Sequence, residues 1–300
     1  MGEIYVQGDP AGLAAAWAGA GRDPRVAALE LFYPVGRVLD LAAEVDSRIG
    51  RDGLAAASRW LLDTWAPGWE AEVSPATAEV LATKPVLVYG NHPSLLTPFL
   101  VAATAGRPDL RIVSASFLDR LLPHYARWAF SVELPVRNWG EQLRRGGVSR
   151  LLLAWLIQYL TPPQPEERRK AANLRALAAA AGHVRSGGAL LIAPSGWTLR
   201  PRPWLPGIGR IVRSLEDAPG PEGYWLVPFR EEHTSDARTR ATLGRGPLAR
   251  LKRRLVYRYP VTIRYGPPVP RSALAPFPAE AEAIARLLQN QYRTVFPRRG

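Results

Sequence analysis

The chain has 300 residues, of which 47% are hydrophobic, so it can bury a substantial core and is not expected to be disordered. It contains no cysteine, which excludes disulfide bonds, thiolate zinc sites and cysteine nucleophiles. The formal net charge of +13 favours anionic partners, although a codon bias toward arginine would produce the same excess.

The first expected elements are helices near the N-terminus. Residues 10–65 are rich in alanine, and the Asp-Pro pairs at residues 9–10 and 23–24 are typical helix starts. Apolar residues recur at helical spacing in two stretches, residues 29–42 and 54–65. We therefore expect an N-terminal helical segment at residues 1–66 that packs on the core; a membrane-dipping hairpin is the alternative.

From residue 67 onward, short β-type runs alternate with helical ones. This order predicts an α/β fold with a mostly parallel central sheet flanked by helices, in one domain at residues 67–300. The expected strands are residues 86–89, 111–115, 132–136, 189–192, 224–229 and 255–265. The expected helices are residues 95–105, 118–129, 142–159, 166–185, 208–215 and 279–292.

No part of the chain is expected to cross a membrane. The longest apolar run, residues 148–160, is interrupted by Arg150 and is shorter than the roughly 20 residues that a spanning helix needs. The N-terminus lacks the order of a signal peptide. We therefore expect a cytoplasmic protein, and its basic surface suits peripheral association with the inner face of the membrane.

The segment GNHPSLLTP, residues 90–98, is the most informative stretch for function. It follows a β-type run and leads into a helical pattern, so His92 is expected at the carboxyl end of a strand, where α/β folds build their sites. A histidine there is suited to act as a general base near neutral pH. A helix-capping or core histidine is the alternative interpretation.

Four later segments each contain an apolar β-type run; the first ends in arginine, the third contains a proline, and the second and fourth lead into glycine-bearing turns. They are VELPVR at residues 132–137, LLIAPSGWTLR at 190–200, WLVPF at 225–229 and VTIRYGPPV at 261–269. Together with residues 90–98, they resemble in order the conserved blocks of the glycerolipid acyltransferase family, which acylates glycerol 3-phosphate and lysophosphatidic acid. The resemblance covers residues 67–300.

The resemblance implies a role for each matching residue. In the family pattern N-H-x-S-x-x-D, Asn91, His92 and Ser94 match, and Thr97 stands in the place of the aspartate. The resemblance implies a catalytic site in which His92 is the base and Asn91, Ser94 and Thr97 support its position. Substrate binding is implied for five residues in the later blocks: Arg137, Ser195, Gly196, Thr198 and Arg200. The implied donor is an acyl thioester on coenzyme A or acyl carrier protein, and the implied acceptor is a glycerophosphate or another anionic lipid alcohol. No metal or redox cofactor is implied.

Two departures from the family pattern affect charge. Thr97 can hydrogen-bond the imidazole, but it brings no negative charge to stabilise the protonated ring. Ser195 stands where the family's third block has a glutamate. A reduced rate is the direct expectation, unless a carboxylate from elsewhere in the chain supports the histidine. The strand-end candidates for that carboxylate are Asp119, Glu133 and Glu141.

Two other functions stay open. A catalytically impaired homologue that binds lipid or phosphate without turnover is consistent with the missing aspartate. A serine hydrolase would use Ser195 with His233, near which Glu231 and Asp236 lie in sequence, but Trp197 violates the small-residue rule of a nucleophile elbow. Nucleic-acid binding is suggested only by charge, without a recognisable motif.

Overall fold

The structure is a computed structural model of the whole chain, and it describes residues 35–133, 165–196, 203–221, 223–233 and 259–297. Its centre is an eight-stranded sheet with the order β1-β7-β6-β2-β5-β3-β4, and β8 pairs with β6 beside this path. The strands are β1 Glu70–Glu72, β2 Val86–Gly90, β3 Arg111–Ala115, β4 Ala129–Val132, β5 Ala189–Ile192, β6 Trp225–Glu232, β7 Thr262–Tyr265 and β8 Val269–Pro270.

Most strand pairs of this sheet are parallel. β2 lies between β5 and β6 and is parallel to both, and β3 pairs in parallel with β4 and β5. The antiparallel pairs are those of β6 with β7 and with β8. The expected α/β fold class with a mostly parallel central sheet is therefore confirmed.

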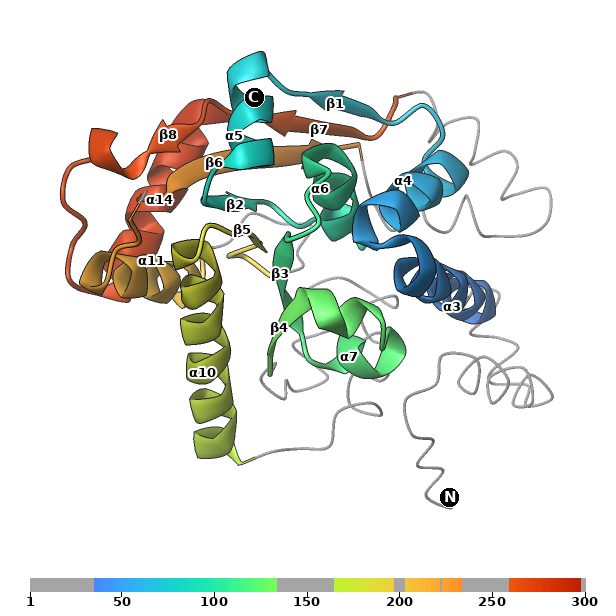
Figure 1. Cartoon of the computed structure of the whole chain (residues 1–300), viewed down its shortest axis with the longest axis horizontal. Coiled ribbons are helices and arrows are strands. Elements are labelled where there is room, and N and C mark those ends of the chain that lie inside the picture. The colour runs from blue at the N-terminus through green and yellow to red at the C-terminus, as the bar shows by residue number, and fades with distance from the viewer. Residues whose placement is uncertain (1–34, 134–164, 197–202, 222, 234–258, 298–300) are drawn as a thin grey trace.

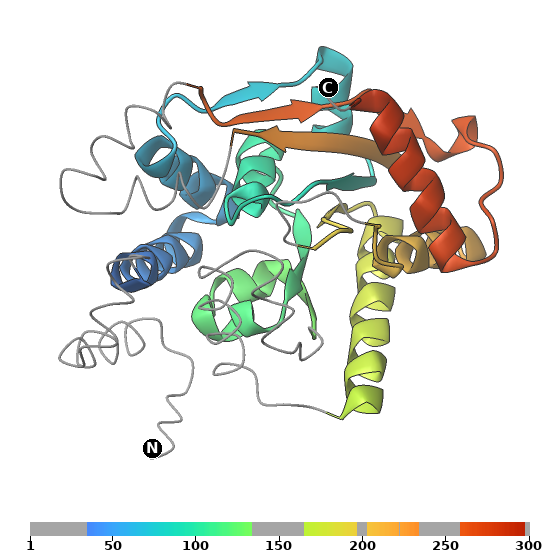
Figure 2. The ribbon, with the colours of Figure 1, turned by 180° about the vertical axis from the view of Figure 1, so that it is seen from behind.

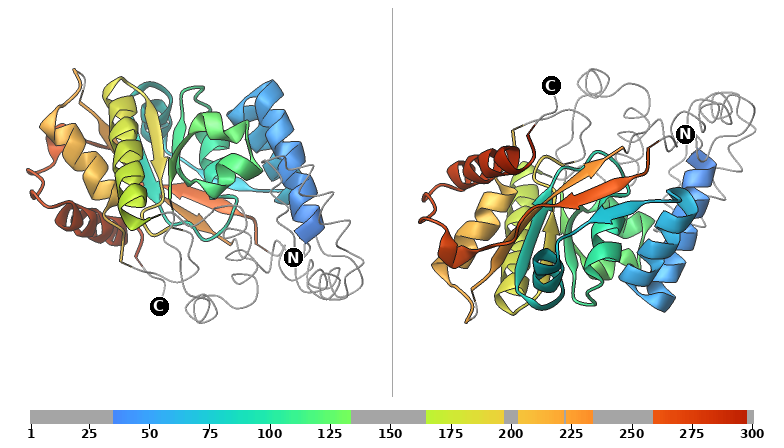
Figure 3. Two further views of the ribbon diagram at one scale, coloured as in Figure 1. Left: turned by 90° about the horizontal axis from the view of Figure 1, so that it is seen from below. Right: turned by 90° about the horizontal axis from the view of Figure 1, so that it is seen from above.

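Helices cover both faces of the sheet (Figures 1 and 3). On one side lie α3 Val35–Asp52, α4 Leu54–Trp65, α5 Pro75–Thr83, α6 Thr97–Ala105, α7 Phe117–Leu121 and the short 3-10 helix η1 Tyr125–Trp128. On the other side lie α10 Glu166–Arg185, α11 Gly207–Asp217 and α14 Ala281–Val295, with the 3-10 turn η2 Arg271–Ala273 nearby. The layered arrangement follows from strands that are apolar on both faces.

The buried strand β2 shows how the two cores are separated. Val86 and Val88 point into the core beneath α4 and α6, whereas Leu87 and Tyr89 point into the core beneath α10, α11 and α14. This alternation is the period-2 geometry of a strand.

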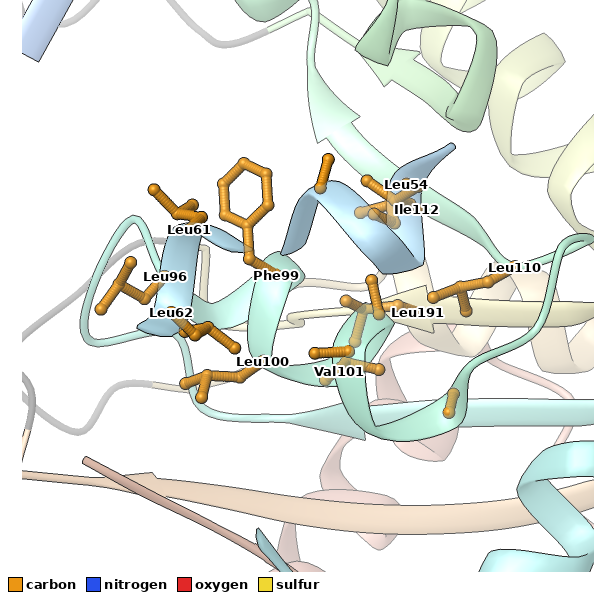
Figure 4. Close-up of a cluster of buried hydrophobic side chains, with 14 of the residues drawn as sticks. Leu54, Leu61, Leu62, Leu96, Phe99, Leu100, Val101, Leu110, Ile112 and Leu191 are labelled. Atoms are coloured by element: carbon orange, nitrogen blue, oxygen red, sulfur yellow. The ribbon is translucent and has the colours of Figure 1, made fainter. Parts of the chain in front are cut away.

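The first core joins the N-terminal helices to the sheet. Figure 4 shows Leu61 and Leu62 of α4 facing Phe99 and Leu100 of α6. All four side chains are buried. The boundary at residue 66 between the expected N-terminal segment and the α/β domain stays a prediction.

The second core packs α11 against α14 (Figure 2). The helices approach so closely at Gly209 that a Cβ atom there would lie 1.8 Å from the Ala281 carbonyl oxygen. A glycine at this position therefore serves helix packing. Within the described residues, no helix is long and apolar enough to cross a membrane.

Several predicted elements keep their bounds in the structure, and others shift. The strands at residues 111–115 and 189–192 and the helix at 166–185 are confirmed to the residue. The strand expected at 132–136 instead begins at Ala129 and ends at Val132, and the helix expected at 118–129 is divided into α7 and η1. The helix expected at 142–159 and the helix starts at residues 9–10 and 23–24 lie outside the described residues.

Candidate functional site

The candidate site lies at the edge of the sheet where the central parallel strands end. His92 follows β2, Glu231 is the penultimate residue of β6, and Ser195 follows β5. Because β2 lies between the other two strands and is parallel to both, these three residues emerge at the same edge. Carboxyl-terminal sheet edges are where α/β folds place their ligands.

His92 is tied to the first residue of the next helix. Its Nδ1 atom lies 2.9 Å from Oγ1 of Thr97, which begins α6 and is buried. The same hydroxyl forms a short hydrogen bond with Oε2 of Glu231 and lies 3.0 Å from the Ser94 carbonyl oxygen. The Thr97 hydroxyl group therefore links the His92 ring to the Glu231 carboxylate.

The number of hydrogens fixes the direction of this chain of bonds. A threonine hydroxyl has one hydrogen, and a carboxylate is a stronger acceptor than a carbonyl oxygen. Thr97 therefore donates to Glu231, and its remaining lone pairs accept from the Nδ1–H group of His92. We infer the tautomer with hydrogen on Nδ1, which leaves a lone pair on Nε2.

Glu231 is the buried carboxylate of the site. Its residue exposure is 3%, and its Oε1 atom accepts a 2.5 Å hydrogen bond from Ser94 Oγ while Oε2 accepts from Thr97. Both carboxylate oxygens therefore have hydroxyl donors, as a buried charged group requires. Ser94 also accepts a hydrogen bond from the backbone N–H of Leu96, which holds the turn between β2 and α6.

Asn91 connects the ends of β2 and β6. Its Nδ2 atom donates to the Glu231 carbonyl oxygen at 2.9 Å, and its Oδ1 atom accepts from the Glu231 N–H at 2.7 Å. The side-chain amide thus extends the pairing of the two strands by one residue beyond the ladder, which ends at Gly90 opposite Phe229. A Cβ atom at Gly90 would lie 2.1 Å from the Phe229 carbonyl oxygen, so this approach requires glycine.

The surroundings of His92 keep its ring neutral. Burial lowers the pKa of the imidazole from 6.5 to about 4, and a hydrogen bond with the Ser94 backbone opposes this shift. By surface area the residue is partly exposed, so the ring is desolvated without being sealed. Among the described residues, Nε2 has no hydrogen-bond partner. A neutral imidazole with an unoccupied Nε2 can accept a proton.

The carboxylates that sequence reasoning considered as partners of His92 lie elsewhere. Asp119 accepts a hydrogen bond from Ser131, and Glu133 accepts one from Ser116. Glu141 lies outside the described residues. Glu231 was considered only as a neighbour of His233. Its signal was available in the alternation of β6, because Val227 and Phe229 face the core that contains α6, and Glu231 continues that face.

Two of the five residues expected to bind substrate are described. Ser195 Oγ donates a 3.0 Å hydrogen bond to the Gly196 carbonyl oxygen, and Gly196 has a φ of +60° in the turn after β5. The other three, Arg137, Thr198 and Arg200, lie outside the described residues. Their proposed contacts with an anionic acceptor therefore stay predictions.

The geometry around Ser195 gives the serine hydrolase alternative no support. In the contacts of the described chain, the Ser195 hydroxyl bonds the neighbouring backbone. His233 follows β6 with a φ of 62° and stacks on the Tyr259 ring, with ring centroids 5.2 Å apart. A nucleophile would instead need its hydroxyl hydrogen-bonded to a base.

No protein-family model and no curated protein matches the sequence. Among solved structures, the chain is similar to the 1-acyl-sn-glycerophosphate (LPA) acyltransferase PlsC from Thermotoga maritima, with 15% sequence identity and a TM-score of 0.36. The alignment covers 96% of this chain and 90% of that chain. The identity and the TM-score are both too low to assign a family or an activity.

Proposed function

We propose that this protein is an acyltransferase that moves a fatty acyl group from a thioester to the hydroxyl group of a glycerophospholipid precursor or a related lipid alcohol. The observation that carries the proposal is the bonded series His92, Thr97 and Glu231 at the carboxyl edge of the sheet. It presents a neutral imidazole whose Nε2 atom has no partner among the described residues. The ordered sequence blocks supply the choice of acyl transfer among the reactions that need such a base.

The proposed reaction uses His92 as its one catalytic residue in the described chain. Nε2 removes the proton of the acceptor hydroxyl while the oxygen attacks the thioester carbonyl carbon. The tetrahedral intermediate then expels the thiolate, which takes the proton from the imidazolium, and the products are an ester and a free thiol. The base is thereby regenerated without a covalent enzyme intermediate.

Thr97 and Glu231 are positioning residues in this proposal. The Thr97 hydroxyl holds the ring at Nδ1 and leaves Nε2 for the substrate, and the Glu231 carboxylate fixes the direction of that hydroxyl. The negative charge of the family's aspartate is thus replaced by a carboxylate one hydroxyl group farther from the ring. Because the charge is more distant, it stabilises the imidazolium less than a directly bonded carboxylate does.

Substrate recognition is assigned to the turn after β5 and to two arginines of the later sequence blocks. We propose that Arg137 and Arg200 bind the anionic group of the acceptor through the bidentate geometry of guanidinium. Ser195, Gly196 and Thr198 are proposed to donate hydrogen bonds to the same group. The donor is a fatty acyl thioester of coenzyme A or acyl carrier protein, and the enzyme acts at the inner face of the membrane as a peripheral protein.

The test is an acyl transfer assay with the full chain. Labelled acyl-coenzyme A and acyl carrier protein thioesters are incubated with a panel of acceptor alcohols, including glycerol 3-phosphate and lysophosphatidic acid. We expect ester formation by the parent protein and a loss of at least about 100-fold in the His92→Ala variant. The matched control is His183→Gln, because His183 hydrogen-bonds the Asp109 carbonyl oxygen on another part of the sheet.

A second candidate function is the binding of lipid or phosphate without turnover, and the missing aspartate at position 97 favours it. The same assay separates it from the enzyme. Acceptor binding by the parent protein without ester formation from any thioester would establish the binding protein. Equal transfer by the parent and the His92→Ala variant would remove His92 from the mechanism.

A further inference from the structure

A cluster of cationic side chains lies at the opposite edge of the sheet from His92. Arg111 is the first residue of β3, whereas His92 follows the last residue of β2. Both strands are parallel to β5, so the two residues lie at opposite edges. Arg111 lines a cavity of about 340 Å³ together with His124, Arg127 and Trp128 of the η1 segment and Gly50 of α3. Figures 1 and 3 show α3 beside α7, which leads into η1.

His124 is held in the wall of this cavity by a buried carboxylate. Its Nδ1 atom lies 2.8 Å from Asp46 Oδ2, and Asp46 is only 3% exposed. Asp46 also accepts hydrogen bonds from the backbone N–H groups of His124 and Tyr125. This arrangement fixes the ring with hydrogen on Nδ1. The other ring nitrogen, Nε2, has no hydrogen-bond partner in the described part of the chain.

The ring of His124 lies against the backbone of α3. A Cβ atom at Gly50 would lie 2.6 Å from Cδ2 and 2.9 Å from Nε2 of this imidazole. The absence of a side chain at Gly50 therefore makes the position of the ring possible. This contact offers a way to disturb the cavity without changing its charge.

Neither arginine of the cavity has a carboxylate partner in the described chain. The Arg111 guanidinium lies 4.9 Å from the centre of the Trp128 ring and donates to the Leu110 carbonyl oxygen. Arg127 is exposed and forms no ion pair with any described residue. No aspartate or glutamate is among the described residues that line the cavity. By contrast, the Arg271 guanidinium forms an ion pair with the Glu216 carboxylate.

We propose that this cavity is a binding site for a phosphate group, carried by a phosphomonoester. Two guanidinium groups supply bidentate donors and positive charge, which phosphate oxygens require. His124 Nε2, which carries no hydrogen in this tautomer, can accept the hydrogen of a P–OH group of the monoprotonated phosphate, and the Arg111 guanidinium lies over the Trp128 ring. The volume of about 340 Å³ suits a small organic phosphate.

This site is independent of the proposed acyl transfer. Arg111 begins β3, whereas His92 follows the end of β2, so the two sites lie at opposite edges of the sheet. A His92→Ala variant should therefore bind phosphate as the parent does. Loss of acyl transfer and loss of phosphate binding are thus separate outcomes.

The direct test is a titration with inorganic phosphate followed by proton NMR of the histidine ring hydrogens. The chain has four histidines, and a His124→Gln variant identifies the resonance of His124. At constant pH, with chloride keeping the ionic strength constant, we expect a saturable shift of the His124 Cε1–H resonance. The resonance of His183, which contacts Asp109 instead, should stay in place.

Two variants test the geometry of the cavity, and a third variant serves as the control. Arg127→Gln removes a cation from the cavity, and Gly50→Ala displaces the His124 ring while it favours helix formation. Each should weaken the apparent affinity about tenfold or more. Arg286→Gln removes an equivalent exposed charge from α14 and should leave the affinity unchanged. Thermal unfolding of each variant confirms that it is folded.

The source of the phosphate group is decided by two further titrations. One uses soluble glycerol 3-phosphate, and the other uses phosphatidylcholine vesicles that contain phosphatidic acid. Binding in either case that depends on Arg127 supports the site and identifies its source as soluble or membrane-bound. The proposal is overturned if about 10 mM phosphate produces no saturable shift at His124, or if Arg127→Gln and Arg286→Gln weaken binding equally.

Discussion

Thr97 and Glu231 are 134 residues apart in the chain and share a buried hydrogen bond beneath the His92 ring. Their contact is possible because β2 and β6 are neighbours in the sheet, although β3, β4 and β5 come between them in the sequence. Through this bond, a carboxylate from β6 supports a histidine that lies beyond the end of β2. The charge that is absent from position 97 is therefore present in the site.

Replacement of Glu231 by glutamine should slow acyl transfer by about 10- to 100-fold, less than the roughly 10⁴-fold loss for a directly bonded aspartate in serine proteases. The amide has one acceptor oxygen for the hydroxyl groups of Ser94 and Thr97. The hydroxyl that faces the amide nitrogen therefore loses the acceptor for its hydrogen. Steady-state kinetics of Glu231→Gln should show a lower kcat.

The matched control for that variant is Glu133→Gln. Glu133 accepts a hydrogen bond from Ser116 and has no described contact with His92. Its variant should keep the parent kcat. An equal loss in both variants would show that removal of any carboxylate from this region lowers activity, and it would remove Glu231 from its positioning role.

Replacement of Thr97 by valine should lower both stability and activity. The side chain keeps its shape, but Glu231 Oε2 loses a donor and His92 Nδ1–H loses its acceptor. Each buried group left without a partner costs about 1–3 kcal/mol, so urea unfolding should show a clearly lower midpoint. Thr97→Ser retains the hydroxyl and should recover most of both properties. A Thr97→Val protein with parent stability would contradict the bonded series.

Asn91 and Asn173 make the same two-point contact with the backbone of a glutamate, which allows a paired experiment. Asn91 bonds the N–H and carbonyl oxygen of Glu231, and Asn173 bonds those of Glu133. Each change to alanine should lower the free energy of unfolding by about 1–3 kcal/mol. Only Asn91→Ala should also lower kcat, because only that amide fixes the strand that carries Glu231. Similar kinetic losses in the two variants would contradict this difference.

The lowered pKa of His92 predicts the pH dependence of the reaction. Protonation abolishes the base, and burial moves the pKa of the ring from 6.5 to about 4. The acidic limb of kcat/KM should therefore lie near pH 4, with little change between pH 7 and pH 5. Proton NMR of the His92 ring, titrated over the same range, should give the same midpoint. A limb and a midpoint near pH 6.5 would show that the ring is hydrated.

The same shift has a consequence for stability. Because the pKa is lower in the folded state, the unfolded chain binds the proton first as pH falls below 6.5. The contribution of the neutral His92 ring to the free energy of unfolding is therefore complete above pH 6.5. It is lost as pH falls toward 4, and the loss is at most about 3 kcal/mol. Burial also lowers the pKa of His183, so the His92→Gln variant is needed to isolate the effect of His92.

Local sequence patterns predicted the bounds of those elements that begin and end at nearby turn or proline residues. β3 and β5 are short apolar runs bounded by turns, and α10 begins after a proline-rich break, so their bounds could be read directly. The strand expected at residues 132–136 is misplaced because further apolar residues follow Glu133 in the sequence, whereas pairing with β3 begins at Ala129 and ends at Val132. The strand β1 and the helix α5 were not predicted, although Ser74 caps α5 and Pro75 begins it.

The sequence allows the histidine of the candidate site to be predicted, but not the carboxylate that supports it. His92 follows an apolar strand and precedes a helical pattern, and both signals are local. The partnership of Glu231 depends on strand order, because β6 pairs with β2 across a long sequence separation. A sequence pattern shows which face of β6 is buried, but it does not show which strand lies beside it.

The most direct test of the central claim is a double-mutant cycle on acyl transfer, with the parent, His92→Ala, Glu231→Gln and the double variant. Glu231 is proposed to act only through the His92 ring, so its removal should cost nothing further once the ring is gone. We therefore expect the double variant to have the kcat of His92→Ala within about twofold. Losses that multiply fully in the double variant would show that the two residues act independently, and that result would contradict the account.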